Sequence, residues 1–539
     1  MLVAGGVCTI LAIHIAAGLR GVGFGQMWDE GEQLGTLKRS VSALTFTPSS
    51  YYYGGLYHFP GFLALAPTFL SHLPEIIAEL KVAPSQPFDA KKYPSIRAAQ
   101  SEALEKIDQP EFRNLDRRIT LCLVALAILW VFIAARRVSG SPWAALAAAA
   151  ATGLSWELSY HGRWIAADAL QAQLGALTFA LIVVALDART PARQRMWFRL
   201  AAVATGLAIS CKVLGVFLMI PLVIAIVAAT RERRFPRSIV ISVEALAIAF
   251  ATFALTTPGL LLEPIHYVND VFDVSHVYAT FFSDDYPYTE PLFLTRVAKI
   301  ISYLSVVLFS PYAVPAAALV LLAAVGVGVG LRQRRAKTIA LVAFGLAYFV
   351  FVARQRVFVA RNMLILLPVL AILMSVGISQ VISLVRRWRF GPPAVALALS
   401  LVFAANARWL WRTAGTVGST TNATIGRDVI DYIAARPATK FYISPTVMNL
   451  LKGYHEPDVA ALHIQSAPWA DADYVVIDAG HGSGGKTNIA KSATYFASLH
   501  ANFDYYPSLM TFLDLASYGT PIMVLRKDRA AERGVKDGQ

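Results

Sequence analysis

Runs of about 20 apolar residues recur through most of this 539-residue chain. The hydrocarbon core of a bilayer is about 30 Å thick, so a helix needs about 20 mostly apolar residues to cross it. The runs therefore predict a polytopic α-helical membrane protein with about 11 transmembrane helices. The spans expected are 2–19, 119–135, 142–158, 169–186, 200–212, 214–229, 238–256, 311–330, 338–353, 363–385 and 393–410.

The composition agrees with a membrane protein. Hydrophobic residues make up 56% of the chain and charged residues 15%, with a mean hydropathy of +0.53. These values exclude a soluble enzyme, a disordered chain and a disulfide-stapled secreted domain. The three cysteines, Cys8, Cys122 and Cys211, lie inside apolar runs, so they provide neither a disulfide framework nor a metal-ligand set.

Five short basic loops set the expected orientation. They hold 17 of the 48 Lys and Arg residues and only two acids, Asp187 and Glu232, so they account for the whole net charge of +14. Loops rich in Lys and Arg stay in the cytoplasm, and the charge therefore encodes orientation rather than a nucleic-acid partner. The basic residues are Arg136 and Arg137; Arg189, Arg193, Arg195 and Arg199; Arg231, Arg233, Arg234 and Arg237; Arg332, Arg334, Arg335 and Lys337; and Arg386, Arg387 and Arg389.

This orientation divides the chain into a membrane domain, 1–410, and an extracytoplasmic tail, 411–539. Two further outer loops are expected at about 20–118 and 257–298. Segment 56–73 is apolar as well, but it carries two prolines and two histidines, and counting it as a span would invert everything downstream. We interpret it as interfacial or re-entrant.

The tail predicts a small α/β domain. Segment 426–436 has a helical pattern, whereas 439–445, 472–479 and 520–527 have strand patterns. Residues 480–487, GHGSGGKT, fit the P-loop spacing between a strand pattern and a plausible helix at 488–500. The expected outer location, the short tail and the lack of a later strand ending in a magnesium-binding Asp favour a glycine-rich turn instead. No nucleotide is expected.

Asp29 and Glu30 are the strongest local signal. They follow the first span directly, and a carboxylate near a membrane surface has a raised pKa and gains strength as a general base. A solvated acidic helix start explains the pair equally well.

Charged residues also gather between the third and fourth spans, in the segment 156–168. Ionisable groups at membrane depth are costly and are usually paired or functional. Arg163 and Asp168 are the candidates, and an ion pair that only fixes the helix hairpin is the alternative. Lys212, between two apolar runs, is suited to neutralising a phosphate, although simple snorkelling explains it too.

A cluster of arginines before the tenth span breaks the positive-inside trend. Arg354, Arg356 and Arg361 lie on the expected outer side, and the planar guanidinium suits phosphate oxygens. Interfacial anchoring is the alternative. In the middle outer loop, His266, Asp270 and Asp273 can share a helix face and bind a divalent metal, but a purely polar role explains them more simply.

In this order and on one side of the membrane, these segments resemble the GT-C superfamily of membrane glycosyltransferases, particularly its protein-mannosyltransferase and aminoarabinose-transferase-like branch. Ala166-Ala167 stand where the family usually has a proline, and Asn362 stands where it often has a tyrosine. These departures bear on the identity of the substrate more than on the type of reaction. The matching segments are Asp29-Glu30, YYYGGLYHFPGFLALAP, LSYHGRWIAADAL, GLAISCKVLGVFLMIPL and ARNMLILLPVL.

The resemblance implies an inverting transfer of a sugar from a polyprenyl-phosphate donor to an acceptor lipid, glycan or protein. It implies Asp29 as the general base, while Glu30 orients the acceptor or holds a metal. The metal requirement is unknown, and a divalent ion is possible. By the same analogy Arg163, Lys212, Arg356 and Arg361 stabilise the leaving phosphate. Asp168 orients Arg163, and Tyr57 and His58 support the acceptor loop.

The expected location is the plasma (bacterial inner) membrane, with the active site on the extracytoplasmic side. A transporter or lipid flippase is the main alternative, because it also places ionisable groups in the membrane. It predicts two related halves with broken helices, and the sequence has no such repeat. A sensor or assembly protein with an external domain is a third possibility, and it would make Asp29 dispensable.

Overall fold

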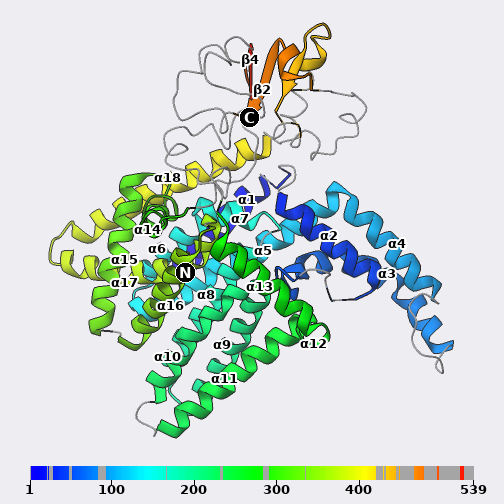
Figure 1. Ribbon diagram of the computed structural model, residues 1–539. Helices are drawn as coiled ribbons and strands as arrows, with labels where there is room; N and C mark the ends of the chain where they lie inside the picture. The colour runs from blue at the N-terminus through cyan, green and yellow to red at the C-terminus, as the bar shows by residue number, and fades with distance from the viewer. Residues whose placement is uncertain are drawn as a thin grey trace. The chain divides into compact units, whose positions relative to one another are not determined.

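The computed structural model describes most of the chain as α-helix (Figure 1). The described residues are 2–20, 22–23, 28–45, 47, 51–82, 93–165, 167–230, 235–282, 290–333, 335–357, 359–419, 429, 432–444, 448, 466–478, 494–496 and 522–526. By its contacts the chain forms two compact units. One comprises Met1–Val22 and Asp29–Trp411, and the other Gly23–Trp28 and Arg412–Gln539.

The first unit contains eighteen α-helices, several short 3-10 turns and one π turn among its described residues. The elements before the middle outer loop are α1 (Leu2–Arg20), α2 (Trp28–Ala43), η1 (Gly55–His58), α3 (Phe59–Val82), α4 (Pro94–Asp108), α5 (Pro110–Ser139), α6 (Pro142–Gly153), α7 (Trp156–Gly162), α8 (Ala167–Leu186), α9 (Pro191–Cys211), η3 (Val213–Leu218), α10 (Met219–Thr230) and α11 (Phe235–Thr256). The later ones are α12 (Gly259–Leu262), α13 (Pro264–Thr280), α14 (Phe293–Ser302), η4 (Tyr303–Val307), α15 (Ala313–Gln333), α16 (Arg335–Arg354), η5 (Ala360–Ile365), α17 (Leu366–Val385) and α18 (Gly391–Ser419).

Ten helical segments of the described chain are long and apolar enough to cross a membrane. Nine of them match predicted spans, and the tenth is Gly55–Lys81. Together with the small sheet described below, they confirm the prediction of a polytopic α-helical membrane protein with an α/β region at its C-terminal end.

Two predicted spans differ in the structure. The run 142–158 is two short helices, α6 and α7, because the chain breaks at Leu154-Ser155. Ser155 Oγ accepts a hydrogen bond from the backbone N–H of Leu158 and donates one to the carbonyl of Leu308, which fixes the start of α7. The predicted span 200–212 is the end of the longer helix α9, and it stops at Cys211, directly before Lys212.

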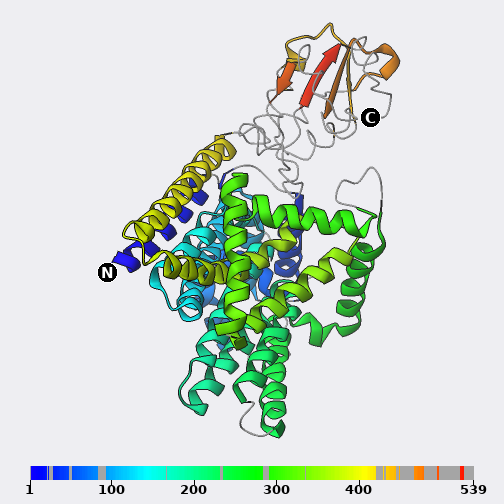
Figure 2. The same cartoon turned by 90° about the vertical axis from the view of Figure 1, so that its left-hand side faces the viewer.

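The centre of the bundle is formed by α8 and α17, whose side chains are mostly buried. Helix α8 packs against α5 and α9, and α17 packs against α5 and α15. Two glycines let α15 and α17 touch. A Cβ at Gly326 would lie 1.8 Å from the Leu373 carbonyl oxygen, and one at Gly377 would lie 1.9 Å from that of Leu322. Helices α9, α10 and α11 run side by side away from this centre (Figures 1 and 2).

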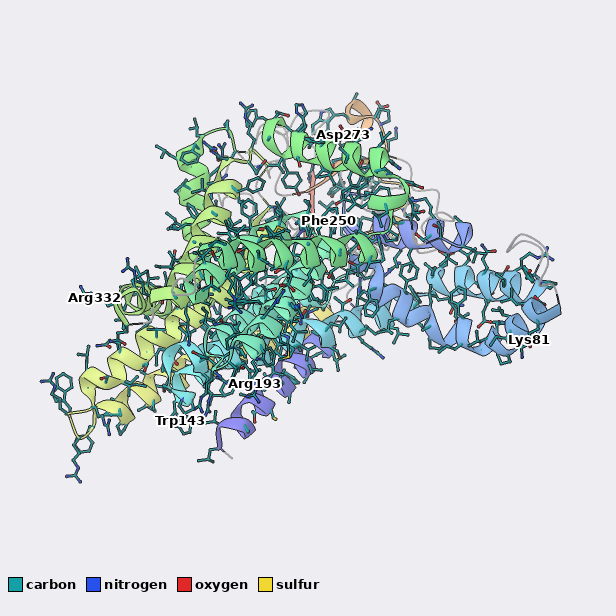
Figure 3. All side chains as sticks on the ribbon, turned by 90° about the horizontal axis from the view of Figure 1, so that it is seen from below. Lys81, Trp143, Arg193, Phe250, Asp273 and Arg332 are labelled. Carbon is teal, nitrogen blue, oxygen red and sulfur yellow. The ribbon has the colours of Figure 1, made fainter. Side chains whose placement is uncertain are left out.

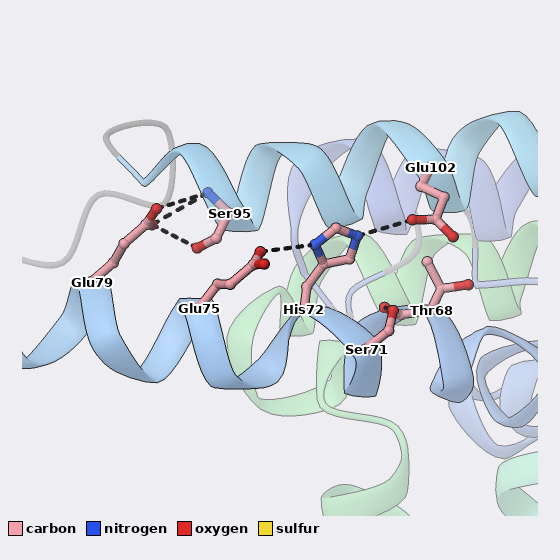
Figure 4. Close-up of polar contacts among 7 residues, drawn as sticks. All are labelled: Thr68, Ser71, His72, Glu75, Glu79, Ser95 and Glu102. Carbon is pink, nitrogen blue, oxygen red and sulfur yellow. Dashed lines mark hydrogen bonds and ion pairs between the residues drawn. The ribbon is translucent and has the colours of Figure 1, made fainter.

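Helices α3 and α4 form a hairpin beside the bundle, and Lys81 lies near its far end (Figure 3). Polar contacts join the two helices (Figure 4). His72 Nε2 lies 2.9 Å from a Glu102 oxygen, and Ser95 Oγ donates to Glu79 at 2.6 Å. Polar pairs along most of its length favour an interfacial position for α3, which stays a prediction because length and composition also allow a span.

The described part of the second unit contains a four-stranded sheet. Its strands are β1 (Phe441–Ile443), β2 (Tyr474–Asp478), β3 (Thr494–Phe496) and β4 (Ile522–Arg526), in the order β1-β2-β4-β3. Strands β1 and β2 are parallel, and β4 is antiparallel to both β2 and β3.

Three of these strands confirm predicted ones, at 439–445, 472–479 and 520–527. Val429 and the residues 432–434 of the predicted helix 426–436 are helical. The helix predicted at 488–500 is wrong at Thr494–Phe496, where β-branched and aromatic residues pair with β4 instead. The glycine-rich segment 480–487 lies outside the described residues.

Candidate active site

The candidate site lies beside the central helices, where the ends of several helices and the short segments between them bring polar side chains together. Arg163 follows α7, Asp168 lies in the first turn of α8, and Arg361 lies in η5. Lys212 adopts an extended conformation between α9 and η3, with φ −154° and ψ 130°, and Gln171 Nε2 donates to its carbonyl at 2.9 Å. Segments distant in sequence therefore supply one polar cluster.

Asp168 is the centre of this cluster. Its carboxylate lies 2.6 Å from Lys212 Nζ and 3.2 Å from Arg361 Nε. Lys212 also donates to Asn362 Oδ1 at 2.6 Å, and the Tyr348 hydroxyl holds the Asn362 carbonyl at 2.7 Å. The relative exposures of Asp168, Lys212 and Arg361 are 2%, 9% and 4%. One buried carboxylate thus faces two buried cations, so this group of three carries an excess positive charge.

Arg163 is also fully buried. Its Nε donates to the Ser159 carbonyl at 3.2 Å, and its guanidinium lies 5.1 Å from the Trp156 ring and 5.8 Å from the Tyr160 ring. Aromatic faces compensate part of the cost of a buried cation. The structure therefore brings three of the four predicted phosphate-binding residues into the protein interior.

Arg356 is the fourth, and it lies elsewhere. Its side chain is exposed and donates to the Thr280 carbonyl at 3.3 Å, while its backbone N–H donates to the Tyr278 carbonyl at 2.8 Å. Helix α16 ends at Arg354, and the irregular stretch after it carries Arg356 towards the end of α13 rather than towards Asp168. The structure does not place Arg356 in the cluster.

Glu30 is completely buried and forms a two-pronged ion pair. Arg117 Nε donates to Oε1 at 2.8 Å and Nη2 to Oε2 at 2.5 Å, and the backbone N–H of Ile165 adds a third bond at 3.2 Å. Arg117 also binds the Val22 carbonyl. Glu30 therefore joins α2 to α5 and to the loop before α8 through the contacts of its carboxylate.

Asp29 lies in the first turn of α2, immediately before Glu30, and its side chain lies outside the described part of the structure. Because Glu30 is anchored beside Ile165, the backbone of Asp29 lies near the loop that carries Arg163. Arg117 was missed by the sequence reasoning. Its signal was an Asp116-Arg117-Arg118 run at the start of an otherwise apolar helix.

A segment of the first loop that is rich in tyrosine and glycine packs beside the cluster. Tyr57 is buried and its hydroxyl donates to the Ile165 carbonyl. The Tyr53 ring lies 5.0 Å from that of Tyr57 and 5.9 Å from Lys212 Nζ. His58 is half-buried, with its ring 5.1 Å from Tyr57. Tyr57 and His58 are therefore placed beside the cluster.

Two glycines allow this segment to approach the bundle. A Cβ at Gly54 would lie 2.2 Å from the Ser210 carbonyl oxygen, and one at Gly55 would lie 2.2 Å from that of Thr256. The N–H of Gly55 donates to Thr257 Oγ1 at 3.1 Å. No larger residue fits here without moving backbone.

The middle outer loop shows no metal centre in its described part. His266 lies 3.5 Å from Asp270 and 3.4 Å from Glu263, and these carboxylates instead accept hydrogen bonds from the backbone N–H and the hydroxyl of Tyr51. Across all described residues, no group of three or more His, Cys, Asp or Glu could hold a metal ion. The suggested metal set of His266, Asp270 and Asp273 is not assembled.

Comparison with known families decides what this arrangement is. Residues 105–275, which contain Arg117, Arg163, Asp168 and Lys212, match the family model of dolichyl-phosphate-mannose-protein mannosyltransferases. The predicted resemblance to the GT-C superfamily is thereby confirmed. No curated protein matches the chain.

Two solved GT-C structures resemble the whole chain distantly. One is ArnT from Cupriavidus metallidurans bound to undecaprenyl phosphate, with 13% identity, a TM-score of 0.46 and coverage of 96% of this chain and 98% of that one. The other is the oligosaccharyltransferase AglB from Archaeoglobus fulgidus in complex with an inhibitory peptide and a dolichol-phosphate. It has 13% identity, a TM-score of 0.45 and coverage of 87% and 69%.

Proposed function

We propose that the protein transfers a sugar from a polyprenyl-phosphate donor to an acceptor on the extracytoplasmic side, with inversion at the anomeric carbon. The observation that carries this proposal is the buried Asp168 carboxylate facing both Lys212 and Arg361. Burying a charge is costly unless an opposite charge compensates it. A phosphate supplies the negative charge that this group lacks.

The chemistry of the leaving group fits these residues. When the bond from the anomeric carbon to the phosphate oxygen breaks, its electron pair stays on the phosphate, which gains one negative charge. Lys212 and the planar fork of Arg361 are already held by Asp168 and Asn362, so they stabilise this charge without first reorganising. Arg163, between α7 and α8, is a third buried cation.

In this proposal Asp29 is the general base. It accepts the proton of the acceptor hydroxyl while the oxygen attacks the anomeric carbon opposite the phosphate, and a single in-line displacement inverts that carbon. Glu30 is a positioning residue, because its pair with Arg117 fixes the first turn of α2. Tyr57 and His58 support the same loop. Arg356 has no part in phosphate binding.

Mass spectrometry of cell-envelope lipids, glycans and glycoproteins tests this function. A deletion strain is expected to lose a sugar from one acceptor and to accumulate the polyprenyl-phosphate sugar. The wild-type gene restores the modification, whereas Asp29→Asn at equal expression does not. Full restoration by Asp29→Asn would contradict the catalytic role and favour the transporter or assembly alternatives.

A further inference from the structure

A second set of buried polar side chains lies beside the Asp168 cluster. The Tyr303 hydroxyl donates to Glu157 Oε2 at 2.8 Å, and His161 Nε2 lies 3.5 Å from the same oxygen. The relative exposures of Glu157, His161 and Tyr303 are 3%, 1% and 0%. Glu157 and His161 are one turn apart on α7, so the carboxylate holds one edge of the imidazole ring.

Tyr303 is placed in this position by a backbone turn of an uncommon type. It is the first residue of η4, a π turn directly after α14. Such turns are rare and are found frequently at functional sites. A buried tyrosine therefore holds the carboxylate that in turn holds His161, and all three groups lie within the protein interior.

The other ring nitrogen of His161 is the notable feature. Nδ1 is buried and has no hydrogen-bond partner among the residues that the structure describes. The same holds for Nε1 of Trp164, whose ring lies 4.8 Å from the imidazole. Buried polar atoms of native proteins are normally hydrogen-bonded, so two such nitrogens on neighbouring rings call for a ligand.

These rings border the proposed phosphate site. The guanidinium of Arg361 lies 5.9 Å from the Trp164 ring, and Arg361 pairs with Asp168. Helix α7 contacts η5, the segment that carries Arg361. The Trp164 ring therefore lies between the imidazole of His161 and the guanidinium of Arg361, at the border of the proposed phosphate site.

We propose that His161 binds the phosphate of the donor through Nδ1–H, with Glu157 and Tyr303 as positioning residues. This assignment rests on the proposed function. A carboxylate faces one ring nitrogen and a phosphate oxygen would face the other, so each nitrogen has a hydrogen-bond acceptor in front of it. The bond from Nδ1–H to the phosphate is charge-assisted and strengthens as the phosphate gains charge in the transition state.

Two substitutions separate binding from structural support. The amide nitrogen of Asn occupies nearly the position of histidine Nδ1, whereas that of Gln occupies the position of Nε2. His161→Asn therefore keeps a donor towards the phosphate and loses the contact with Glu157. His161→Gln keeps the contact with Glu157 and loses the donor. A purely structural role of His161 requires the Gln variant to be the better tolerated one.

The measurement is the affinity of the purified full-length protein for farnesyl phosphate, with farnesol as the phosphate-free reference. We expect His161→Asn to bind farnesyl phosphate within about 3-fold of wild type and His161→Gln to bind it about 10-fold or more weakly, with farnesol binding unchanged. Equal binding by wild type and His161→Gln, or a larger loss in His161→Asn, would overturn the proposal.

Tyr303→Phe is the second variant, for the case that the Gln variant does not fold. It removes one hydroxyl remote from the ligand, and we expect an affinity about 3-fold lower. An unchanged affinity would overturn the positioning role. A wild-type protein that does not prefer farnesyl phosphate to farnesol would instead refute the proposed function itself, so the two failures are distinguishable.

Discussion

At the scale of single residues, Asp168 and Glu102 make the same kind of contact in different surroundings. Asp168 faces Lys212 and Arg361 in the interior, whereas Glu102, on α4, pairs with Lys106 and His72 and has a side chain that is 40% exposed. Removing one partner of a buried ion pair leaves uncompensated buried charge, while exposed pairs contribute little. The two carboxylates thus form a matched comparison.

Asp168→Asn is therefore expected to destabilise the protein by about 3–5 kcal/mol and to abolish sugar transfer. Glu102→Gln, the control, is expected to cost less than about 1 kcal/mol and to leave transfer intact. Thermal unfolding in detergent and a transfer assay measure the two effects. Equal stability of the two variants would show that Lys212 and Arg361 do not depend on Asp168.

Residues of the site were predictable from the sequence where a charge broke an apolar pattern. Arg163, Asp168 and Lys212 stood out because charge at membrane depth is costly. Arg117 was overlooked because it belongs to a run of charges that resembles an ordinary helix start. Arg356 lies outside the cluster because α16 ends at Arg354, and the residue pattern does not fix helix ends to that precision.

At the scale of elements, the position of the first loop depends on close contact between its backbone and that of the helical bundle. Gly55 lies against the Thr256 carbonyl with no space for a side chain, whereas a Cβ at Gly345, in α16, meets nothing within 4 Å. The helices could be predicted because each apolar run is visible in the sequence itself. This loop could not, because its position follows from long-range contacts between η1 and α9.

Gly55→Ala is expected to shift Tyr57 and the adjoining loop and to lower sugar transfer by about 100-fold, because misplacement by about 1 Å has that effect. The control, Gly345→Ala, is expected to transfer normally. Turnover of purified protein at saturating donor is the measurement. Wild-type turnover in Gly55→Ala would mean that the loop need not be seated in this way.

Helix α14 is fixed at its start by Glu290. Burial of Glu290 acts to raise its pKa, but hydrogen bonds from Lys299 and from the backbone N–H of Leu292, with the nearby positive charges, outweigh burial and hold the pKa below its ordinary value of 4.5. A carboxyl whose folded-state pKa is lowered stabilises the protein above its unfolded pKa, and this stabilisation is lost as the pH falls through the folded value.

We therefore expect wild type to have a higher unfolding temperature than Glu290→Gln at pH 7, and the difference to shrink as the pH falls below about 4.5. Thermal unfolding across this pH range checks the sign. A difference that grows towards acid pH would contradict the lowered pKa of Glu290.

At the scale of the whole molecule, the orientation is set by charge rather than by the fold. Nine predicted spans recur as candidate membrane helices, but α3 also qualifies by length and composition. The basic loops favour one orientation, with the site and the C-terminal region on the extracytoplasmic side. The sequence could give this expectation because the rule concerns loop composition and not tertiary contacts.

Cysteine labelling in intact cells tests the orientation. In a background with Cys8 and Cys122 replaced by Ser, a membrane-impermeant maleimide is expected to label Asp273→Cys and not Arg193→Cys, two positions marked in Figure 3. Permeabilised cells, in which both react, provide the control. The reverse pattern would place the basic loops outside.

The cations around Asp168 are proposed to bind the donor phosphate, and a comparison of two lysines tests this binding. Lys212 is buried in the cluster, whereas Lys106, paired with Glu102 on α4, is 43% exposed. The measurement is the preference of purified protein for farnesyl phosphate over farnesol. Lys212→Met is predicted to reduce this preference about 10- to 100-fold, and Lys106→Met to leave it unchanged. A folded Lys212→Met variant with the wild-type preference would contradict the account.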